Sequence, residues 1–186
     1  MAGEGTAIWI HLDVSKTESI QSAVKWLNMQ TDRLDCLINN AGIYPDAGWT
    51  ISTIPRNQLE QTFNTNTFGA LELSQACLDL LKRSDAPKII NVSSAMGQLK
   101  GMSTAFPSYS LSKLAMNGLT LMLSNELASS GISINSVSPG WVRTEMGGPN
   151  ADRSVEEGAE GIIWLADDAP HELTGKFFRD GEELSW

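Results

Sequence analysis

The sequence predicts an α/β fold in which a parallel sheet is covered by helices on both faces. Short, continuous apolar runs of strand length alternate along the chain with longer segments whose apolar residues recur at helical spacing. The length of 186 residues suits one domain with a sizeable core. No linker, internal repeat or low-complexity segment divides the chain, so residues 1–186 are expected to form a single domain.

Composition and charge exclude several classes of function. A hydrophobic fraction of 41% and a charged fraction of 19% are typical of a soluble globular protein. The net charge of −9 and the pI near 4.6 argue against a nucleic-acid partner, because phosphate binding needs a basic surface. No apolar run approaches the roughly 18 residues of a membrane span, and residues 1–6 lack the features of a signal peptide.

Cysteine and histidine usage indicates a cytoplasmic protein without a metal site. Cys36 and Cys77 lie in apolar runs, so we expect buried free thiols rather than a disulfide, as is usual in the cytoplasm. His11 and His171 are the only histidines and form no ligand cluster, which argues against a metal-dependent hydrolase.

The N-terminal part of the chain is expected to hold two strands and one helix. Residues 7–12 form a strand-like apolar run that stops at Asp13. Ser15 and Glu18 have the spacing of a capping box that begins a helix. The apolar face of this helix comprises Ile20, Ala23, Val24 and Leu27. A second apolar strand over residues 35–40 ends in two amides and is followed by Gly42.

A long helix is expected from about Leu59 to Leu81, after a loop over residues 44–55. Asn66 falls on the apolar stripe of this helix, where a polar amide must find hydrogen-bond partners. Two interpretations are equally supported by position alone. Asn66 is either a satisfied core residue at a slight helix bend, or a residue that holds water or backbone near a functional site.

The third apolar strand, residues 88–94, ends at Ser94. Ligands of open α/β sheets bind at the C-terminal ends of strands, although serines there are equally typical of a loop start. After a loop over residues 97–107, a helix is expected from Ser108 to Ser129. This helix has two apolar stripes, which indicates contact with the sheet on one side and with another layer or a partner subunit on the other.

The last third of the chain completes the alternation. An alternating strand over residues 132–138 is ended by Pro139 and Gly140, and a turn-rich segment follows at 147–152. A helix is expected from Ser154 to about Ala166, with a serine cap and an acidic first turn. The final strand, residues 176–179, precedes a turn at 180–181.

The pair Tyr109 and Lys113 carries the predicted chemistry. Four residues correspond to about 400° of helical rotation, so the two side chains share one face of a helix. A cation beside a phenol lowers the phenol pKa from its usual value of about 10. A hydroxyl such as that of Ser94 can orient a carbonyl toward the proton that the phenol donates. This spacing is common by chance, so the interpretation depends on the neighbouring motifs.

Taken together, the motifs resemble those of the short-chain dehydrogenase/reductase family over nearly the whole chain. They are Leu-Asp13-Val, Asn39-Asn-Ala-Gly42, Asn66-Thr-Phe-Gly69, Asn91-Val-Ser-Ser94, Tyr109-x-x-x-Lys113 and Pro139-Gly140-Trp-Val-Arg-Thr144. Each motif is weak alone, but the ordered set is specific. The C-terminal segment Gly-Lys-Phe-Phe-Arg-Asp-Gly, in a chain that ends at Trp186, looks most like the carbonyl-reductase-like branch.

The resemblance implies a Rossmann-type sheet and hydride transfer between a nicotinamide cofactor and a small-molecule carbonyl or alcohol. It implies four catalytic residues: Tyr109 as general acid/base, Lys113 to lower its pKa and hold the nicotinamide ribose, Ser94 to fix the substrate oxygen, and Asn66 to hold a water. It also implies cofactor contacts from Asp13, Val14, Asn40, Ala41, Gly42, Tyr109, Lys113, Pro139, Gly140, Val142 and Thr144. NADP is favoured over NAD by similarity to the carbonyl-reductase-like branch.

The chain departs from the family pattern at its beginning. Members of the family usually open with a strand, a glycine-rich turn, a helix and a second strand, and this sequence has none of them. We therefore expect an N-terminally truncated Rossmann-type sheet that lacks its first two strands. Those strands would separate residues 7–12 from residues 35–40, so the sheet has a gap unless these two segments pair or a second chain fills it.

Two functions remain open. One is a reductase-like enzyme. The other is a relative that has lost dinucleotide binding and acts as a binding or oligomer partner, with the helices from Leu59 to Leu81 and from Ser108 to Ser129 as a candidate homo-oligomer interface.

We expect the 186-residue chain to bind NADPH weakly or not at all. The missing glycine-rich turn normally presents backbone amides and a helix N-terminus to the cofactor pyrophosphate. Titration of NADPH followed by its fluorescence measures the affinity. A dissociation constant in the micromolar range would contradict this prediction.

Overall fold

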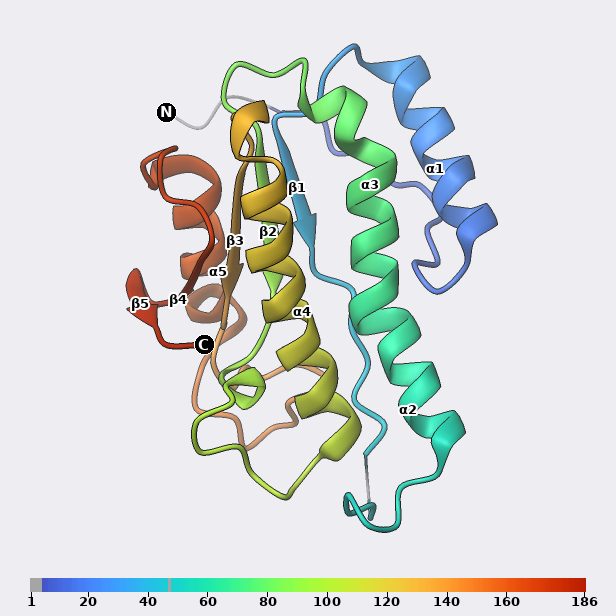
Figure 1. Cartoon of the computed structure of the whole chain (residues 1–186), viewed down its shortest axis with the longest axis vertical. Coiled ribbons are helices and arrows are strands. Elements are labelled where there is room, and N and C mark those ends of the chain that lie inside the picture. Colours follow the sequence, from blue (N-terminus) through green and yellow to red (C-terminus); the bar gives the residue numbers. More distant parts are fainter. Residues whose placement is uncertain (1–4, 47) are drawn as a thin grey trace.

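A computed structural model of the chain describes residues 5–46 and 48–186. In this part, five strands form one sheet in the order β1-β2-β3-β4-β5. Their bounds are Cys36–Asn39, Lys88–Val92, Ser133–Val137, Lys176–Arg179 and Glu182–Leu184. The first four strands are parallel, and β5 pairs antiparallel with β4. The predicted α/β fold with a mainly parallel, Rossmann-type sheet is confirmed (Figure 1).

Helices cover both faces of this sheet (Figure 1). Helices α1, α3 and α4 lie on one face, with bounds Thr17–Gln30, Gly69–Leu81 and Pro107–Glu126. Helix α2 (Arg56–Phe63) leads into α3 through a π-helical turn at Asn64–Phe68. Helix α5 (Val155–Ile163) covers the opposite face and ends in a second π-helical turn at Trp164–Asp168. Short 3₁₀ turns occupy Ala95–Gly97 and Ala128–Ser130.

The sheet separates two apolar cores. Ile89 of β2 and Ile134 of β3 belong to the core beneath α1 and α3, whereas Ile90 and Val137 belong to the core beside α5 and the turn that follows it. Successive side chains of a strand point to opposite faces. Both faces of the central strands are therefore buried, which explains why their sequences read as continuous apolar runs.

The prediction of a strand over residues 7–12 is wrong. This segment has no regular secondary structure, and the side chains of Ile8 and Trp9 are 61% and 85% exposed. A strand needs a hydrogen-bonding partner, and within the described residues β1 pairs with β2 alone. Instead of joining the sheet, residues 10–11 line an open groove with Ser19, Ser22 and Trp26 of α1. Direct pairing of the two segments across the gap therefore does not occur.

The predicted capping box at Ser15 is also wrong. Helix α1 begins at Thr17, and its N-cap residue Lys16 makes no side-chain capping hydrogen bond. The amide and hydroxyl of Ser15 both donate to Oδ1 of Asp13, at 3.0 and 2.6 Å. The nearby carboxylate therefore engages Ser15 in a turn before the helix, so Ser15 does not serve as its cap.

Other predicted elements are confirmed with small differences. Ser154 caps α5 in a reciprocal capping box with Glu157. The helix expected from Leu59 to Leu81 begins earlier, at Arg56, and its α-helical geometry is interrupted at the π-helical turn. Strand β5 was not predicted. Both cysteines are free thiols, Cys77 buried and Cys36 partly buried. Residues 1–4 and Ala47, which belong to the predicted N-terminal segment and loop, lie outside the described residues.

The described residues contain no helix that is long and apolar enough to cross a bilayer. They also contain no group of three or more metal-binding side chains arranged around a common point.

Gly69 lies where the chain before α1 crosses the start of α3. A Cβ atom at position 69 would lie 2.9 Å from Cβ of Val14 and closer still to the Val14 carbonyl oxygen. We expect Gly69→Ala to reduce the free energy of unfolding by about 1–3 kcal/mol, because overpacking outweighs the gain of about 1 kcal/mol in helix propensity. Urea unfolding measures this change.

Gly118→Ala is the matched control for that substitution. Gly118 lies within α4, and an added Cβ atom would meet no other heavy atom within 4 Å. Helix propensity alone should then stabilise this variant by up to about 1 kcal/mol. Two variants of equal stability would contradict a close approach at Gly69.

Candidate active site

Tyr109 and Lys113 lie one turn apart near the beginning of α4, as predicted. The side chain of Lys113 is buried, and its Nζ donates a hydrogen bond to the carbonyl oxygen of Val92 at 2.7 Å. The same Nζ lies 5.7 Å from the centroid of the Tyr109 ring. The ammonium group is thus anchored to the C-terminal end of β2 and faces the phenol ring.

Burial controls the protonation of both groups. Desolvation lowers the pKa of Lys113 to about 8, so the amine is still mostly protonated at neutral pH. Desolvation raises the pKa of Tyr109, and a hydrogen bond with Ser94 opposes this effect. The net shift of the tyrosine is therefore opposite to the one expected from its spacing to Lys113. The physical reason is that burial dominates, while the lysine is directed toward a backbone carbonyl.

Ser94 lies at the end of β2, next to Tyr109. It is the N-cap of the 3₁₀ turn Ala95–Gly97, and its Oγ accepts a hydrogen bond from the Met96 amide at 3.2 Å. Its hydroxyl lies close enough to the phenol of Tyr109 to lower the pKa of that group. The hydroxyl predicted to face the substrate oxygen is therefore within reach of the predicted proton donor.

Asn66 combines parts of both interpretations that its position allowed. It is fully buried in the π-helical turn Asn64–Phe68. Its Oδ1 accepts from the Ile43 amide at 2.7 Å, and its Nδ2 donates to the Ile43 carbonyl and to Ser112 Oγ, both at 3.0 Å. It is therefore a satisfied core residue at a local distortion of the helix, and it also holds backbone beside the site.

Gly42 brings the loop after β1 to the same place. A Cβ atom on Gly42 would lie 3.5 Å from Asn66 Oδ1 and 3.6 Å from Lys113 Nζ. Asn40 and Ala41, which precede Gly42, are exposed. The loop thus presents open backbone next to the amide and amine of the site.

Asp13 and Val14 reach the same helical region from the other side. The Val14 backbone lies against Gly69, three residues after Asn66. The carboxylate of Asp13 accepts hydrogen bonds from Ser15 and forms an ion pair with Lys16 at 2.9 Å, which together lower its pKa to about 2. Its oxygens are thus already engaged by neighbouring residues.

The segment from Pro139 to Thr144 follows β3. Ser138 Oγ accepts from the amides of Ala95 and Gly140, at 3.2 and 3.4 Å, so this loop lies beside the end of β2. Gly140 has φ of +80°, which favours glycine. Val142 pairs with Arg153 in an isolated bridge, and Thr144 is exposed. The structure brings the start of this loop to the site, whereas Thr144 lies at its exposed end.

Sequence reasoning missed Asp46. Its side chain is 1% exposed and accepts three hydrogen bonds from the start of α4. Oδ1 accepts from the amide and hydroxyl of Ser108, at 3.0 and 2.8 Å, and Oδ2 accepts from the Tyr109 amide at 2.8 Å. In the sequence, this aspartate in a loop of turn-forming residues looks like an ordinary turn residue. No local pattern distinguishes it, because its partners lie 62 and 63 residues further along the chain.

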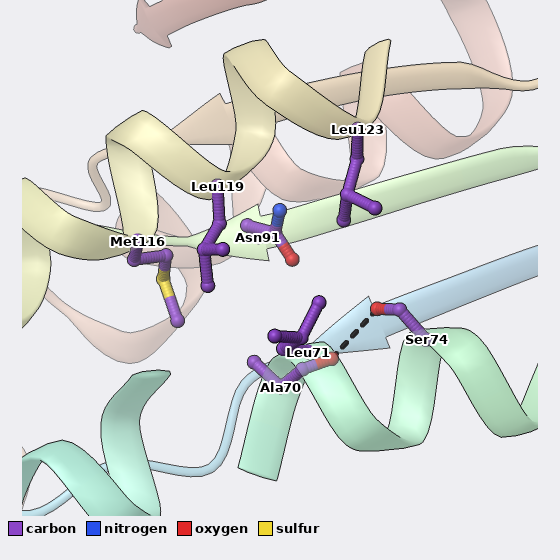
Figure 2. A pocket seen from close by; sticks show the side chains of 7 residues that line it. All are labelled: Ala70, Leu71, Ser74, Asn91, Met116, Leu119 and Leu123. Carbon is purple, nitrogen blue, oxygen red and sulfur yellow. Dashed lines mark hydrogen bonds between the residues drawn. The ribbon is translucent and has the colours of Figure 1, made fainter. Parts of the chain in front are cut away.

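A crevice between α3 and α4 is separate from these residues. Figure 2 shows the side chain of Asn91 between the two helices. The crevice is lined by Ala70, Leu71, Ser74, Asn91, Met116, Leu119 and Leu123. It has no room for a water molecule, so it is not a substrate pocket. Asn91 instead joins a chain of buried hydrogen bonds that also includes Asn39 and Thr120.

Comparison with known proteins gives the family. The family model described as short chain dehydrogenase matches residues 1–154. The protein named C-signal from Myxococcus xanthus is 31% identical over 162 residues, which cover 86% of this chain and 96% of that protein.

Two solved structures agree closely with the fold. The NADPH-bound carbonyl reductase from chicken fatty liver has a TM-score of 0.88 and 30% identity, and the match covers 96% of this chain and 77% of that one. Carbonyl reductase Sniffer of D. melanogaster has a TM-score of 0.89 and 31% identity, with coverages of 95% and 77%. The chain therefore belongs to the short-chain dehydrogenase/reductase family, and within it to the carbonyl-reductase-like members.

Proposed function

We propose that the chain is an oxidoreductase that reduces a carbonyl group with NADPH, which it binds weakly because the glycine-rich turn is missing, and that Tyr109 is the proton donor. The observation that carries this proposal is the meeting of Ser94, Tyr109 and Lys113 between the end of β2 and the start of α4. When a hydride reaches a carbonyl carbon, negative charge develops on its oxygen. The serine hydroxyl and the phenol would stabilise that charge. A well-placed acid typically contributes about 10²–10⁴-fold in rate.

The protonation of the site suits the proposed reduction of a carbonyl group. Burial raises the pKa of Tyr109, so the phenol carries its proton at neutral pH and is ready to act as an acid. Lys113 is mostly protonated at that pH and would stabilise the phenolate that forms after proton transfer.

The residues around the site fit a nicotinamide cofactor, which supplies the hydride when bound. Lys113 and the open backbone of Asn40, Ala41 and Gly42 would hold its ribose side, because Gly42 leaves this approach free of a side chain. The loop from Pro139 through Val142 to Thr144 would lie along the nicotinamide amide, and Asp13 with Val14 would lie near the adenine. NADP is the proposed form, because similar solved structures are described as bound to NADPH and NADP.

Asn66 would hold a water in a proton relay. Its existing hydrogen bonds limit which of its atoms can bind that water. Its side-chain oxygen and nitrogen already bind Ile43 and Ser112. A water would therefore be held by the backbone at the π-helical turn rather than by the amide group.

The alternative of a non-enzymatic binding partner is not favoured, because the proposed catalytic side chains lie together as proton transfer requires.

We also propose that the outer faces of α2, α3 and α4 form an interface between copies of the chain. Phe68, in the π-helical turn between α2 and α3, is 54% exposed, and Leu121 and Met122 of α4 are 40% and 69% exposed. The free thiols of Cys36 and Cys77 suit a reducing compartment, so the cytoplasm is the proposed location.

Light scattering after gel filtration tests the interface. We expect a mass of at least twice the 20.2 kDa of one chain. Met122→Glu should shift the protein toward the monomer, because a charge would be buried at the contact. Met29→Glu, at a residue 67% exposed on α1, is the control and should leave the mass unchanged. A monomeric parent protein would contradict the proposal.

Tyr109→Phe tests the proposed reaction. Consumption of NADPH with a panel of aldehydes, ketones and quinones should fall by about 10²-fold or more, because the proton donor is removed while the ring remains. The fold should be unchanged by circular dichroism. Tyr44→Phe removes the other phenol hydroxyl of the chain and should retain most of the activity. Unchanged turnover in Tyr109→Phe would rule out the proton-transfer role. Absence of turnover by the parent chain would contradict the proposed reductase activity.

A further inference from the structure

We propose that Asp46 is a positioning residue for the proton donor: its carboxylate fixes the first turn of α4 and thereby sets where the phenol of Tyr109 lies relative to Ser94. This inference rests on the proposed role of Tyr109. Asp46 contacts the backbone of that residue and not the reacting atoms, so it acts through Tyr109.

The start of α4 lacks the local groups that usually complete a helix N-terminus. Its N-cap residue is Phe106, which has no side-chain acceptor and adopts a left-handed conformation with φ of +56°. The amides of Ser108 and Tyr109, in the first turn, therefore have no acceptor from their own cap. Asp46 supplies this acceptor from a loop 62 residues earlier in the chain.

Chemistry suits a carboxylate at this position. Two amides and one hydroxyl converge on its two oxygens, at 2.8 to 3.0 Å. The partial positive charge of a helix N-terminus also favours an anion. The three hydrogen bonds offset the free-energy cost of burying the carboxylate. An apolar residue at this position would leave the two amides unpaired.

The loop that carries Asp46 also contacts Asn66 and Tyr109 through the residues before it. Ile43 is held through its amide and carbonyl by Asn66. The ring of Tyr44 meets the ring of Tyr109 edge-on, with centroids 5.1 Å apart. The segment from Ile43 to Asp46 therefore connects the residues proposed to line the cofactor with the helix that bears the proton donor.

A change in the distance between the phenol of Tyr109 and Ser94 would slow the proposed reaction. The phenol is fixed by the backbone of the first turn and by its neighbours, so a shift of that turn moves the phenol away from Ser94. A displacement of about 1 Å at a reacting group can cost on the order of 10²-fold in rate. Loss of Asp46 should therefore affect the chemical step more than the binding of a carbonyl substrate.

The test compares Asp46→Ala and Asp46→Asn with Ser154→Ala. Ser154 caps α5 on the opposite face of the sheet, so its removal also costs a helix cap but leaves the site intact. The chain has two tyrosines, so protein labelled with [¹³Cζ]tyrosine gives two NMR signals, which Tyr44→Phe assigns. Thermal unfolding shows that each variant is folded.

In Asp46→Ala we expect the Tyr109 signal to move and its apparent pKa to fall toward about 10, because the phenol gains access to water. Asp46→Asn should show a smaller change, because an amide oxygen can accept from Ser108 but its NH₂ group faces the Tyr109 amide. Ser154→Ala should leave the position of the Tyr109 signal and its apparent pKa at their parent values. In steady-state assays, kcat should fall by about tenfold or more in Asp46→Ala, with KM for the carbonyl substrate within about twofold.

Equal Tyr109 signals and pKa values in Asp46→Ala and Ser154→Ala would overturn the proposal. If Asp46→Ala does not fold, Asp46→Asn, which keeps the size of the side chain, takes its place in the same comparison. The NMR measurement needs neither cofactor nor turnover. It therefore decides the role of Asp46 even if Tyr109→Phe shows that the tyrosine is not the proton donor.

Discussion

A chain of buried hydrogen bonds holds the central elements of this fold in register. Asn39 Nδ2 of β1 donates to Ser74 Oγ of α3 at 3.0 Å and to Asn91 Oδ1 of β2 at 2.8 Å. Asn91 Nδ2 in turn donates to Thr120 Oγ1 of α4 at 2.8 Å, and Ser136 Oγ of β3 lies 2.7 Å from the same oxygen. Leaving one such group unpaired costs about 1–3 kcal/mol, so a shift of any strand or helix would be penalised. The apolar cores alone would tolerate more sliding.

The geometry of the site depends on that register. Val92 follows Asn91 directly in β2, and its carbonyl anchors Lys113. Thr120 lies two turns after Lys113 on α4, so its hydrogen bond to Asn91 sets the axial position of the helix along the strand. Tyr109 and Ser94 then meet because their elements are fixed at these two points. A parallel sheet with polar groups in its interior thus determines where the phenol of Tyr109, the proposed proton donor, lies.

Sequence reasoning predicted most elements but not their long-range partners. The strands β1 to β4 were predicted from apolar or alternating runs, and they form because their neighbours in the sheet are also present. Residues 7–12 have similar strand propensity but no partner among the described residues, and they form no strand. Propensity for a strand is therefore not sufficient without a pairing edge.

The same limit applies to single side chains. Ser15 was expected to cap α1, but the carboxylate two residues earlier competes for its hydroxyl and amide. The four proposed catalytic residues were predicted from motifs, and the structure brings them together. Asp46 was not predicted, because its partners lie 62 and 63 residues away and nothing local distinguishes it from a turn residue. Local patterns predict caps and helices, whereas contacts between distant loops follow only from the assembled fold.

The residues proposed for proton transfer and those proposed for cofactor binding are held by different parts of the chain. Ser94, Tyr109 and Lys113 are fixed by contacts among β2, α4 and the loop after β1. Asp13 and Val14 are fixed by the turn before α1 and by the approach to Gly69. The outer edge of β1, where Ile38 is 42% exposed, contributes to neither set of contacts. The proposed geometry for proton transfer can therefore persist whatever the affinity for a dinucleotide, because among the described residues no contact that holds the phenol and the ammonium group depends on the open edge of the sheet.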